Sequence, residues 1–288
     1  MNLKPQTTYD EQVELLKEKG IIINDVPKCI SLLQQINYYR FSAYYLPFRN
    51  TDTQKIFCSI DFDRIKKIYE FDQELRSLIF KTIEKIEIYL RTQISYYHAH
   101  TYGPEGYRSV LNYNPRHDHL KFSRHLDGCI SENSKSLVVQ HHIKNYDGHF
   151  PIWVIIEFFS IGMSSYFYRG LTTQDKKKLA IQLYNANYRN LESWFRCLTD
   201  LRNRCAHYSR LHYWIFPATP KIPKKENYIP TRRLFSQLYM LKLMYLEKDK
   251  WNDDFLKPLI KLVKKYKNDI SLKHLDFPYR WKSILKQK

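Results

Sequence analysis

The clearest pattern in the chain is a run of apolar residues at helical spacing from Asn187 to Leu211. Residues three and four apart share one face of a helix, so an apolar stripe with polar residues opposite predicts an amphipathic helix. Its buried side is expected to contain Leu191, Trp194, Leu198, Leu201, Cys205 and Tyr208. Its opposite side carries Arg196, Asp200, Asn203, His207 and Arg210. We therefore predict one helix over the whole segment, with a polar face turned away from the core.

Capping signals and periodicity also predict helices near the N-terminus. Thr8 and Glu11 have the spacing of a capping box, which opens a first helix. Asp25 or Pro27 opens a second helical region that we expect to continue through Leu46. Its aromatic residues alternate with arginines, which permits stacking on nucleic-acid bases, but their one-face spacing favours core packing. These aromatic residues are Phe41, Tyr44, Tyr45 and Phe48.

The longest periodic stretch predicts a helix from Asp61 to about Thr101, just before Gly103. Glu87 and Arg91 lie at the border of its apolar stripe. Their four-residue spacing favours a salt pair within the helix, and a role beside a functional pocket is the alternative. Both residues therefore stay candidates for supporting a site.

A second strongly apolar segment begins at Pro151, and we predict an unbroken helix from there to Gly170. Glu157 is the only charged residue in its first half, so we expect a buried carboxylate that needs a partner. Glu157 either forms a structural salt bridge with a core arginine or positions Arg202 or His207. The sequence leaves both interpretations open.

Polar and basic segments separate and follow these helices. Two short polar helices are expected at about 117–131 and 134–145, and Thr172 is expected to cap the helix before Asn187. Residues 214–233 contain four prolines and many basic side chains, which predicts an extended segment beside the polar face. The remainder, 234–288, predicts two or three lysine-rich helices with a thin apolar stripe.

The composition favours an all-α fold and an anionic partner. The chain has 288 residues with only seven glycines, long helical periodicity and few alternating runs. Its net charge of +18 predicts attraction to a polyanion, although an anionic membrane surface attracts the same charge. Because the polar start resembles no signal peptide and no apolar run is long enough to span a bilayer, we expect a soluble cytoplasmic protein. No Cys or His spacing matches a metal site, so we expect neither a metal nor a cofactor.

The polar face of the 187–211 helix is suited to chemistry at a phosphodiester. Histidine exchanges protons near neutral pH, and arginine presents donors that match phosphate oxygens. His207 would move a proton, while Arg202 stabilises developing charge and Asn203 orients an oxygen. Since no carboxylate cluster for magnesium accompanies them, we expect metal-free cleavage, which requires the 2′-hydroxyl of RNA. For any single residue, solvated helix surface is the simpler interpretation.

The same residues carry a family resemblance. Arg202-Asn203-Arg204-Cys205-Ala206-His207 matches the Arg-x4-His signature of HEPN ribonucleases. The longer string LRNRCAHYSRL (Leu201–Leu211) resembles the Abi-like (AbiD/AbiF) branch of abortive-infection proteins. Four more segments agree with that branch in order, namely INYYRFSAYYLPF (36–48), IYEFDQELRSL (68–78), IEKIEIYLRTQI (83–94) and FPIWVIIEFFSIG (150–162). After Leu211 the chain reads HYWIFPATPKIP, where many relatives continue with Trp-Asn.

The resemblance implies a HEPN-type helical bundle with additional N-terminal and C-terminal helices. We expect one Abi-like domain over 1–288, divided into an N-terminal region (1–60), a HEPN core (61–211), a basic segment (212–233) and C-terminal helices (234–288). It further implies a metal-independent RNA endonuclease of abortive-infection or toxin type, which leaves 2′,3′-cyclic phosphate and 5′-hydroxyl ends. The catalytic residues would be Arg202, Asn203 and His207. The residues that support them would be Asp200, Glu157, Glu87 and Arg91.

The positive charge of the chain and its family resemblance both predict binding partners. RNA would be bound by the basic residues Arg196, Arg204, Arg210, Lys221, Lys224, Lys225, Arg232 and Arg233. Because one histidine cannot serve both sides of an in-line reaction, and HEPN relatives pair, we expect a homodimer. An antitoxin, either a protein or a structured non-coding RNA, is a further expected partner. The alternatives are a non-catalytic RNA-binding module and a protein-interaction scaffold that uses the same face.

Overall fold

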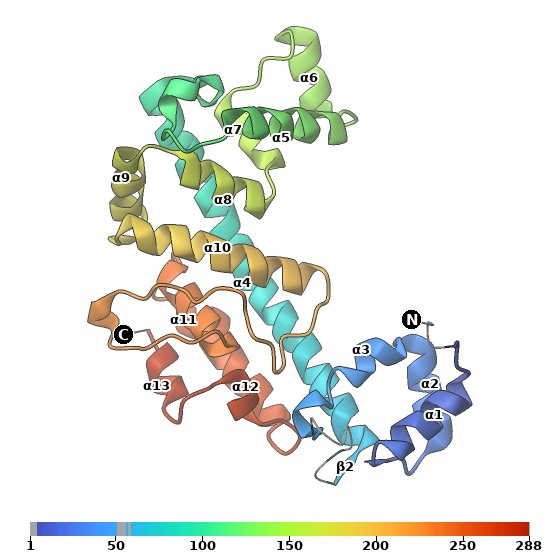
Figure 1. The fold of residues 1–288 in the computed structure, drawn as a ribbon. Coiled ribbons are helices and arrows are strands. Elements are labelled where there is room, and N and C mark those ends of the chain that lie inside the picture. Colours follow the sequence, from blue (N-terminus) through green and yellow to red (C-terminus); the bar gives the residue numbers. More distant parts are fainter. Residues whose placement is uncertain (1–4, 51–55, 57–58, 288) are drawn as a thin grey trace.

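The computed structural model describes residues 5–50, 56 and 59–287, which form an all-α fold (Figure 1). These described residues contain thirteen α-helices and one pair of two-residue strands. The predicted all-α class is confirmed. Within the same residues, no helix combines the length and apolar character that crossing a membrane requires.

The long helix α4 (Phe62–Tyr102) is the axis of the molecule (Figure 1). The Asp61 carboxylate accepts the Arg64 amide at its N-terminus, and Gly103, with a φ of 80°, ends it. Its apolar stripe is buried along the whole length because other helices pack on it at both ends, whereas Phe80, Ile88 and Tyr96 lie outside the stripe and are exposed. The predicted helix is therefore confirmed to within one residue at each end.

The N-terminal region packs beside the first turns of α4 (Figure 1). It consists of α1 (Tyr9–Glu18), β1 (Ile21–Ile22), α2 (Val26–Gln35), α3 (Tyr38–Ser42), a 3-10 turn (Leu46–Phe48) and β2 (Ile60–Asp61), with β1 parallel to β2. The capping box of Thr8 and Glu11 is present, and Asp25 caps α2. Both predicted helix starts are confirmed.

The second helical region is not continuous to Leu46, so that prediction was wrong. Ile36 is extended, and the Asn37 side chain accepts the Tyr39 amide, which starts α3 as a separate helix. The aromatic residues after this break are buried, as core packing predicted. They are Phe41, Tyr44, Tyr45 and Phe48.

The middle of the chain packs around the C-terminal half of α4. It forms 3-10 turns at Gly106–Arg108 and Val110–Asn112, α5 (His119–Glu132), α6 (Leu137–Asn145), α7 (Ile152–Ile155), a 3-10 turn at Ile156–Phe158, α8 (Ile161–Gly170) and α9 (Thr173–Tyr184). The two short polar helices and the Thr172 cap are confirmed.

The predicted unbroken helix from Pro151 to Gly170 was wrong, because α7 and α8 are separate. Phe159 is extended, and the Ser160 hydroxyl accepts the Met163 amide to start α8. The break releases the Phe159 carbonyl from helical pairing, and Arg91 of α4 donates to it at 2.6 Å. A tertiary contact thus replaces a helical hydrogen bond.

The C-terminal part returns to the first half of α4. It contains α10 (Tyr188–Ala206), a 3-10 turn at Lys224–Glu226, α11 (Leu234–Met244), a π turn at Asn252–Leu256, α12 (Lys257–Lys265), a 3-10 turn at Leu272–Leu275 and α13 (Trp281–Leu285). A thin apolar stripe was predicted for these helices. That prediction was wrong for α11, because residues on nearly every side of this helix are buried. Contacts with α4, α10 and α13 surround it.

Candidate active site

Helix α10 carries the Arg-x4-His motif and crosses α4 near its middle (Figure 1). Asn187 caps its N-terminus, and the stripe from Leu191 to Cys205 is buried as predicted. The helix ends at Ala206 and does not continue to Leu211, so the predicted C-terminal boundary was wrong. Tyr208, expected on the buried side, has a φ of 55° and is 70% exposed, so that expectation was wrong. His207 is therefore the C-cap residue, where the chain leaves the helix.

A buried carboxylate on α4 holds the segment that follows His207. Asp72 is fully buried and accepts the amides of Leu211 at 3.1 Å and His212 at 2.8 Å. It also accepts the Tyr44 hydroxyl at 2.8 Å and pairs with Arg76. Burial raises the pKa of the Asp72 carboxyl, and these donors oppose the rise by stabilising the charged form. We call Asp72, Arg76 and Tyr44 the buried clamp.

Helix α3 adds two contacts to the same segment. Arg40 donates to the Tyr208 carbonyl at 2.5 Å, and Arg210 donates to the Ala43 carbonyl at 2.5 Å. Burial lowers the pKa of Arg210, whose guanidinium is engaged inside the molecule. The prediction that Arg210 belongs to an exposed polar face was therefore wrong. Sequence reasoning did not assign a role to Arg40 or Asp72, although both lie in segments that resemble the Abi-like branch.

Arg202 faces α4, where a second group of charged residues meets. Its Nε lies 3.6 Å from a Glu87 carboxylate oxygen, and its guanidinium lies 5.9 Å from the centre of the Phe80 ring. Glu87 also pairs with Arg91 at 2.7 Å. The predicted helix salt pair is confirmed, and Glu87 additionally contacts a motif residue. The Arg202 side chain remains 30% exposed, so it is accessible to a ligand.

Glu157 belongs to the same group but differs from its prediction. Its side chain is 55% exposed, so the expected burial was wrong. The carboxylate lies 3.9 Å from Arg91, which agrees with the salt-bridge interpretation. The 3-10 turn that replaces helix at this point leaves Glu157 at the surface.

His207 and Asn203 are both exposed at the C-terminal end of α10. The His207 amide donates to the Asn203 carbonyl at 2.9 Å, so the two residues are one helical turn apart. An accessible imidazole and an accessible amide thus lie on the helix that also carries Arg202. This arrangement can bind phosphate oxygens and move a proton.

Asp200 and Arg204 form an ion pair with each other, and Arg204 also contacts the loop that follows α10. Asp200 lies 3.5 Å from the Arg204 guanidinium, which stacks on Trp214 at 3.4 Å from the ring centre. Burial lowers the pKa of Arg204. The structure therefore pairs Asp200 with Arg204, whereas the helical spacing predicted only that Asp200 shares the polar side of the helix with His207.

The basic segment runs back along α10 and reaches its N-terminal half. Trp194 donates to the Lys221 carbonyl at 2.7 Å, and the Lys221 amide donates to the Ser193 hydroxyl at 2.9 Å. Arg232 donates to the Phe216 carbonyl at 2.6 Å, and Arg233 lies 4.9 Å from the centre of the Tyr213 ring. The exposed cations of the predicted RNA-binding set are Arg196, Lys221, Lys224, Lys225 and Arg232. The segment therefore places most of these charges away from His207.

The described residues contain no group of three or more His, Cys, Asp or Glu side chains that could hold a metal ion.

No curated protein and no solved structure matches the chain. A family model described as Abi-like protein matches residues 31–213. The matched range includes α3, the buried clamp, Glu87 and the whole motif. The chain therefore belongs to the Abi-like protein family.

Proposed function

We propose that this protein is a metal-independent RNA endonuclease of HEPN type that acts in abortive infection. Membership in the Abi-like family indicates a role in this form of phage defence. The single observation that carries the enzymatic proposal is the arrangement at the end of α10. There, His207 and Asn203 are exposed, and Arg202 is held by Glu87 with part of its guanidinium accessible.

In the proposed reaction, the ribose 2′-oxygen attacks the adjacent phosphorus and the bond to the 5′-oxygen breaks. One general base removes the 2′-hydroxyl proton, and one general acid protonates the departing 5′-oxygen. His207 fills one of these roles, Arg202 stabilises charge on the phosphoryl oxygens and Asn203 orients one of them. The products are a 2′,3′-cyclic phosphate and a 5′-hydroxyl. Glu87 and Arg91 act as positioning residues that hold Arg202.

A homodimer would provide the second proton-transfer group. Two copies related by a two-fold axis bring two histidines to one cleft, which separates the base from the acid. One observation supports this proposal: Phe80 of α4, whose ring centre lies 5.9 Å from the Arg202 guanidinium, is an exposed apolar residue that a second copy could cover. Such a nuclease also requires restraint in its host, so a protein or structured-RNA antitoxin is part of the proposal.

Mapping RNA ends tests the mechanism directly. Purified protein is expected to cut RNA equally well with and without EDTA and to leave 2′,3′-cyclic phosphate ends. His207→Ala should lower the cleavage rate by about a hundredfold or more, since general acid–base catalysis contributes that much. His141→Ala, which removes an exposed histidine of α6, is the control and should cleave normally.

Two outcomes would contradict the proposal. Cleavage that stops on adding EDTA would refute the metal-free mechanism. RNA binding without cleavage by wild-type dimer would identify a non-catalytic RNA-binding module.

A further inference from the structure

A chain of basic hollows lies along the N-terminal half of α10, away from the motif. The first is enclosed by α5, the end of α8 and the first turn of α10, with a volume of about 660 Å³. The second lies between α8, α10 and residues 217–221, and the third lies between the α9–α10 junction and residues 219–230. Arg189 and Lys221 line all three. Because adjacent hollows share residues, we treat them as one feature, the basic groove.

The positive charge of the basic groove is largely uncompensated. Its exposed cations include Arg116, Lys121, Arg169, Arg189, Arg196 and Lys221. Among the described residues, none of these six lies within 4.0 Å of a carboxylate. The acidic residues of the first hollow are engaged, since Glu192 pairs with Lys176 at 2.7 Å and Asp118 accepts the Lys121 amide at 2.9 Å. The groove therefore attracts anions.

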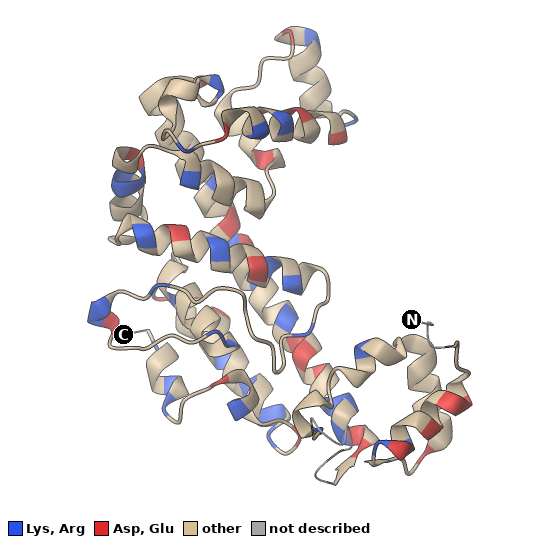
Figure 2. Cartoon of the chain, in the orientation of Figure 1, with Lys and Arg blue, Asp and Glu red and all other residues tan. Residues whose placement is uncertain are grey.

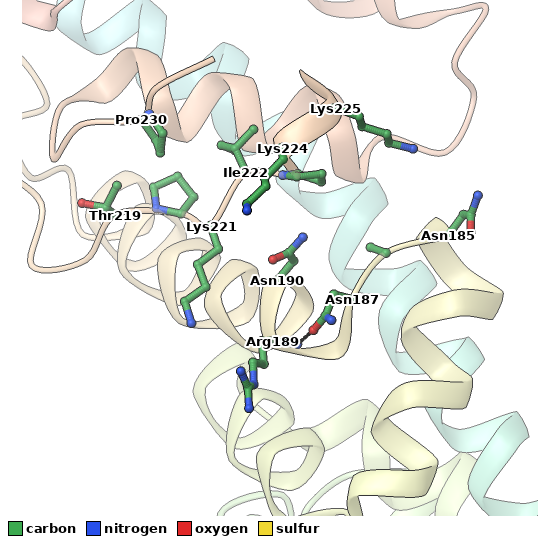
Figure 3. Close-up of a pocket in the computed structure, with 13 residues that line it drawn as sticks. Asn185, Asn187, Arg189, Asn190, Thr219, Lys221, Ile222, Lys224, Lys225 and Pro230 are labelled. Atoms are coloured by element: carbon green, nitrogen blue, oxygen red, sulfur yellow. Dashed lines mark hydrogen bonds between the residues drawn. The ribbon is translucent and has the colours of Figure 1, made fainter. Parts of the chain in front are cut away.

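Internal hydrogen bonds hold the walls of the basic groove in place. The Lys221 backbone is bonded to Ser193 and Trp194 of α10. Asn114 donates to the Gly170 carbonyl at 2.7 Å, which ties the segment before α5 to the end of α8. Figure 3 shows the Lys221 and Arg189 side chains extending in the same direction from their two backbones. Figure 2 shows further Lys and Arg positions on α5, α8 and α9 around this end of α10.

The lining favours a polynucleotide backbone over an acidic protein. Of the described residues that line the first two hollows, none is Leu, Ile, Val, Met or Phe. Protein interfaces normally have an apolar centre, whereas phosphate backbones are bound by cations and polar groups. Tyr166 and Tyr188 lie among these cations, and such rings stack on bases.

A line of exposed residues leads from the basic groove to the motif. Arg189, Arg196 and Asn203 follow one another at seven-residue intervals on α10, and all three are exposed. His207 comes 18 residues after Arg189, which is about five helical turns, so it falls on the same line. The distance along the axis is about 27 Å. Roughly eight stacked nucleotides span that length.

We propose that the basic groove binds the RNA backbone at a distance from the scissile bond, so that the protein selects long RNA over short fragments. This proposal rests on the proposed function, because it assigns the groove to the same RNA that His207 cuts. It assigns Arg116, Lys121, Arg169 and Arg189, which lie outside the motif and outside the Pro-rich segment, to substrate binding.

The test compares a charge-reversal pair in the groove with a matched pair elsewhere. The groove variant is Arg189→Glu with Lys221→Glu, and the control is Lys261→Glu with Lys264→Glu, both exposed on α12. Binding is measured by fluorescence anisotropy in EDTA on a His207→Ala background. The two RNAs are about 30 nucleotides long, which is more than the line on α10 spans, and about six nucleotides long, which is less. Cleavage is measured on the variants with intact His207.

The groove variant is expected to bind the long RNA at least about tenfold more weakly and to have a smaller salt dependence, because phosphate contacts are lost. Its KM for long RNA should rise with little change in kcat, and the short RNA should be unaffected. The control should change affinity little for either RNA.

Three results would overturn the inference. An equal loss in the α12 variant would show that only net charge matters. An equal loss for short and long RNA would place the contacts beside the scissile bond. Competition by polyglutamate as effective as that by RNA would indicate an acidic protein partner. If instead wild-type protein never cleaves but the length-dependent binding remains, the proposed function fails while the groove assignment stands.

Discussion

The two ends of α10 differ in how they are built. At the C-terminal end, the chain leaves the helix at His207 and is held by the buried clamp and by Arg40 of α3. At the N-terminal end, exposed cations line open hollows, and the side-chain contacts of Arg169 and Arg189 are with the tyrosines Tyr166 and Tyr188. Proton transfer needs an imidazole in one position, whereas phosphate binding tolerates flexible lysines and arginines. The difference therefore matches the two tasks that we propose for this helix.

Removal of the clamp should have the largest effect on the molecule. Asp72→Ala leaves Arg76 and two amides without their buried acceptor, which is expected to cost about 3–5 kcal/mol in the free energy of unfolding. Chemical denaturation measures this. Asp63→Ala, at an exposed position of the same helix, should cost less than about 1 kcal/mol. A loss at Asp72 no greater than at Asp63 would remove the basis for the comparison.

Acid should lower the free energy of unfolding through a buried histidine that packs on α8, the helix whose end lines the basic groove. His98 of α4 is fully buried against Phe167 and Tyr102, and burial lowers its pKa from 6.5 to about 4. Below pH 6.5 the unfolded chain binds a proton that the folded protein does not, so stability falls as pH decreases from 6.5 towards 4. At pH 5 this amounts to about 2 kcal/mol. His98→Phe should remove that part of the pH dependence of unfolding, while His100→Phe, at an exposed position, should leave it intact.

The contact between Glu87 and Arg202 should affect catalysis more than stability. Glu87→Gln removes the charge that holds the guanidinium and is expected to lower kcat about tenfold with little change in KM. Glu84→Gln changes an exposed carboxylate one turn away and should be close to wild type. An increase in KM without a change in kcat would instead assign Arg202 to substrate binding alone.

Single exposed lysines should have the smallest effects. Lys224→Ala and Lys225→Ala each remove one cation from the rim of the third hollow, so the affinity for long RNA should fall only about two- to threefold at moderate salt. Cleavage of short RNA should not change. A tenfold loss from either variant would mean that this end of α10 also depends on individually positioned residues.

Much of this architecture is predictable from residue patterns. The start of α4 at Asp61, the capping box of α1 and the buried stripe of α10 follow from local spacing and capping chemistry. Local rules were insufficient where a distant side chain binds the backbone. At the break between α7 and α8, the Phe159 carbonyl accepts a hydrogen bond from Arg91. After α10 ends, Arg40 donates to the Tyr208 carbonyl and Asp72 accepts the His212 amide.

The sequence by itself therefore determined the all-α class, the family resemblance and the identity of the motif residues, because these depend on periodicity and on short strings. Only the tertiary structure decided which charges are free to meet a ligand. All four of these residues are arginines: Arg204, Arg210, Arg189 and Arg196. In the folded chain, the Arg204 guanidinium lies over the Trp214 ring and Arg210 donates to the Ala43 carbonyl, whereas Arg189 and Arg196 are exposed. The physical reason is that an arginine's availability depends on which acceptors the folded chain brings within reach of its guanidinium, and these come from segments that are distant in the sequence.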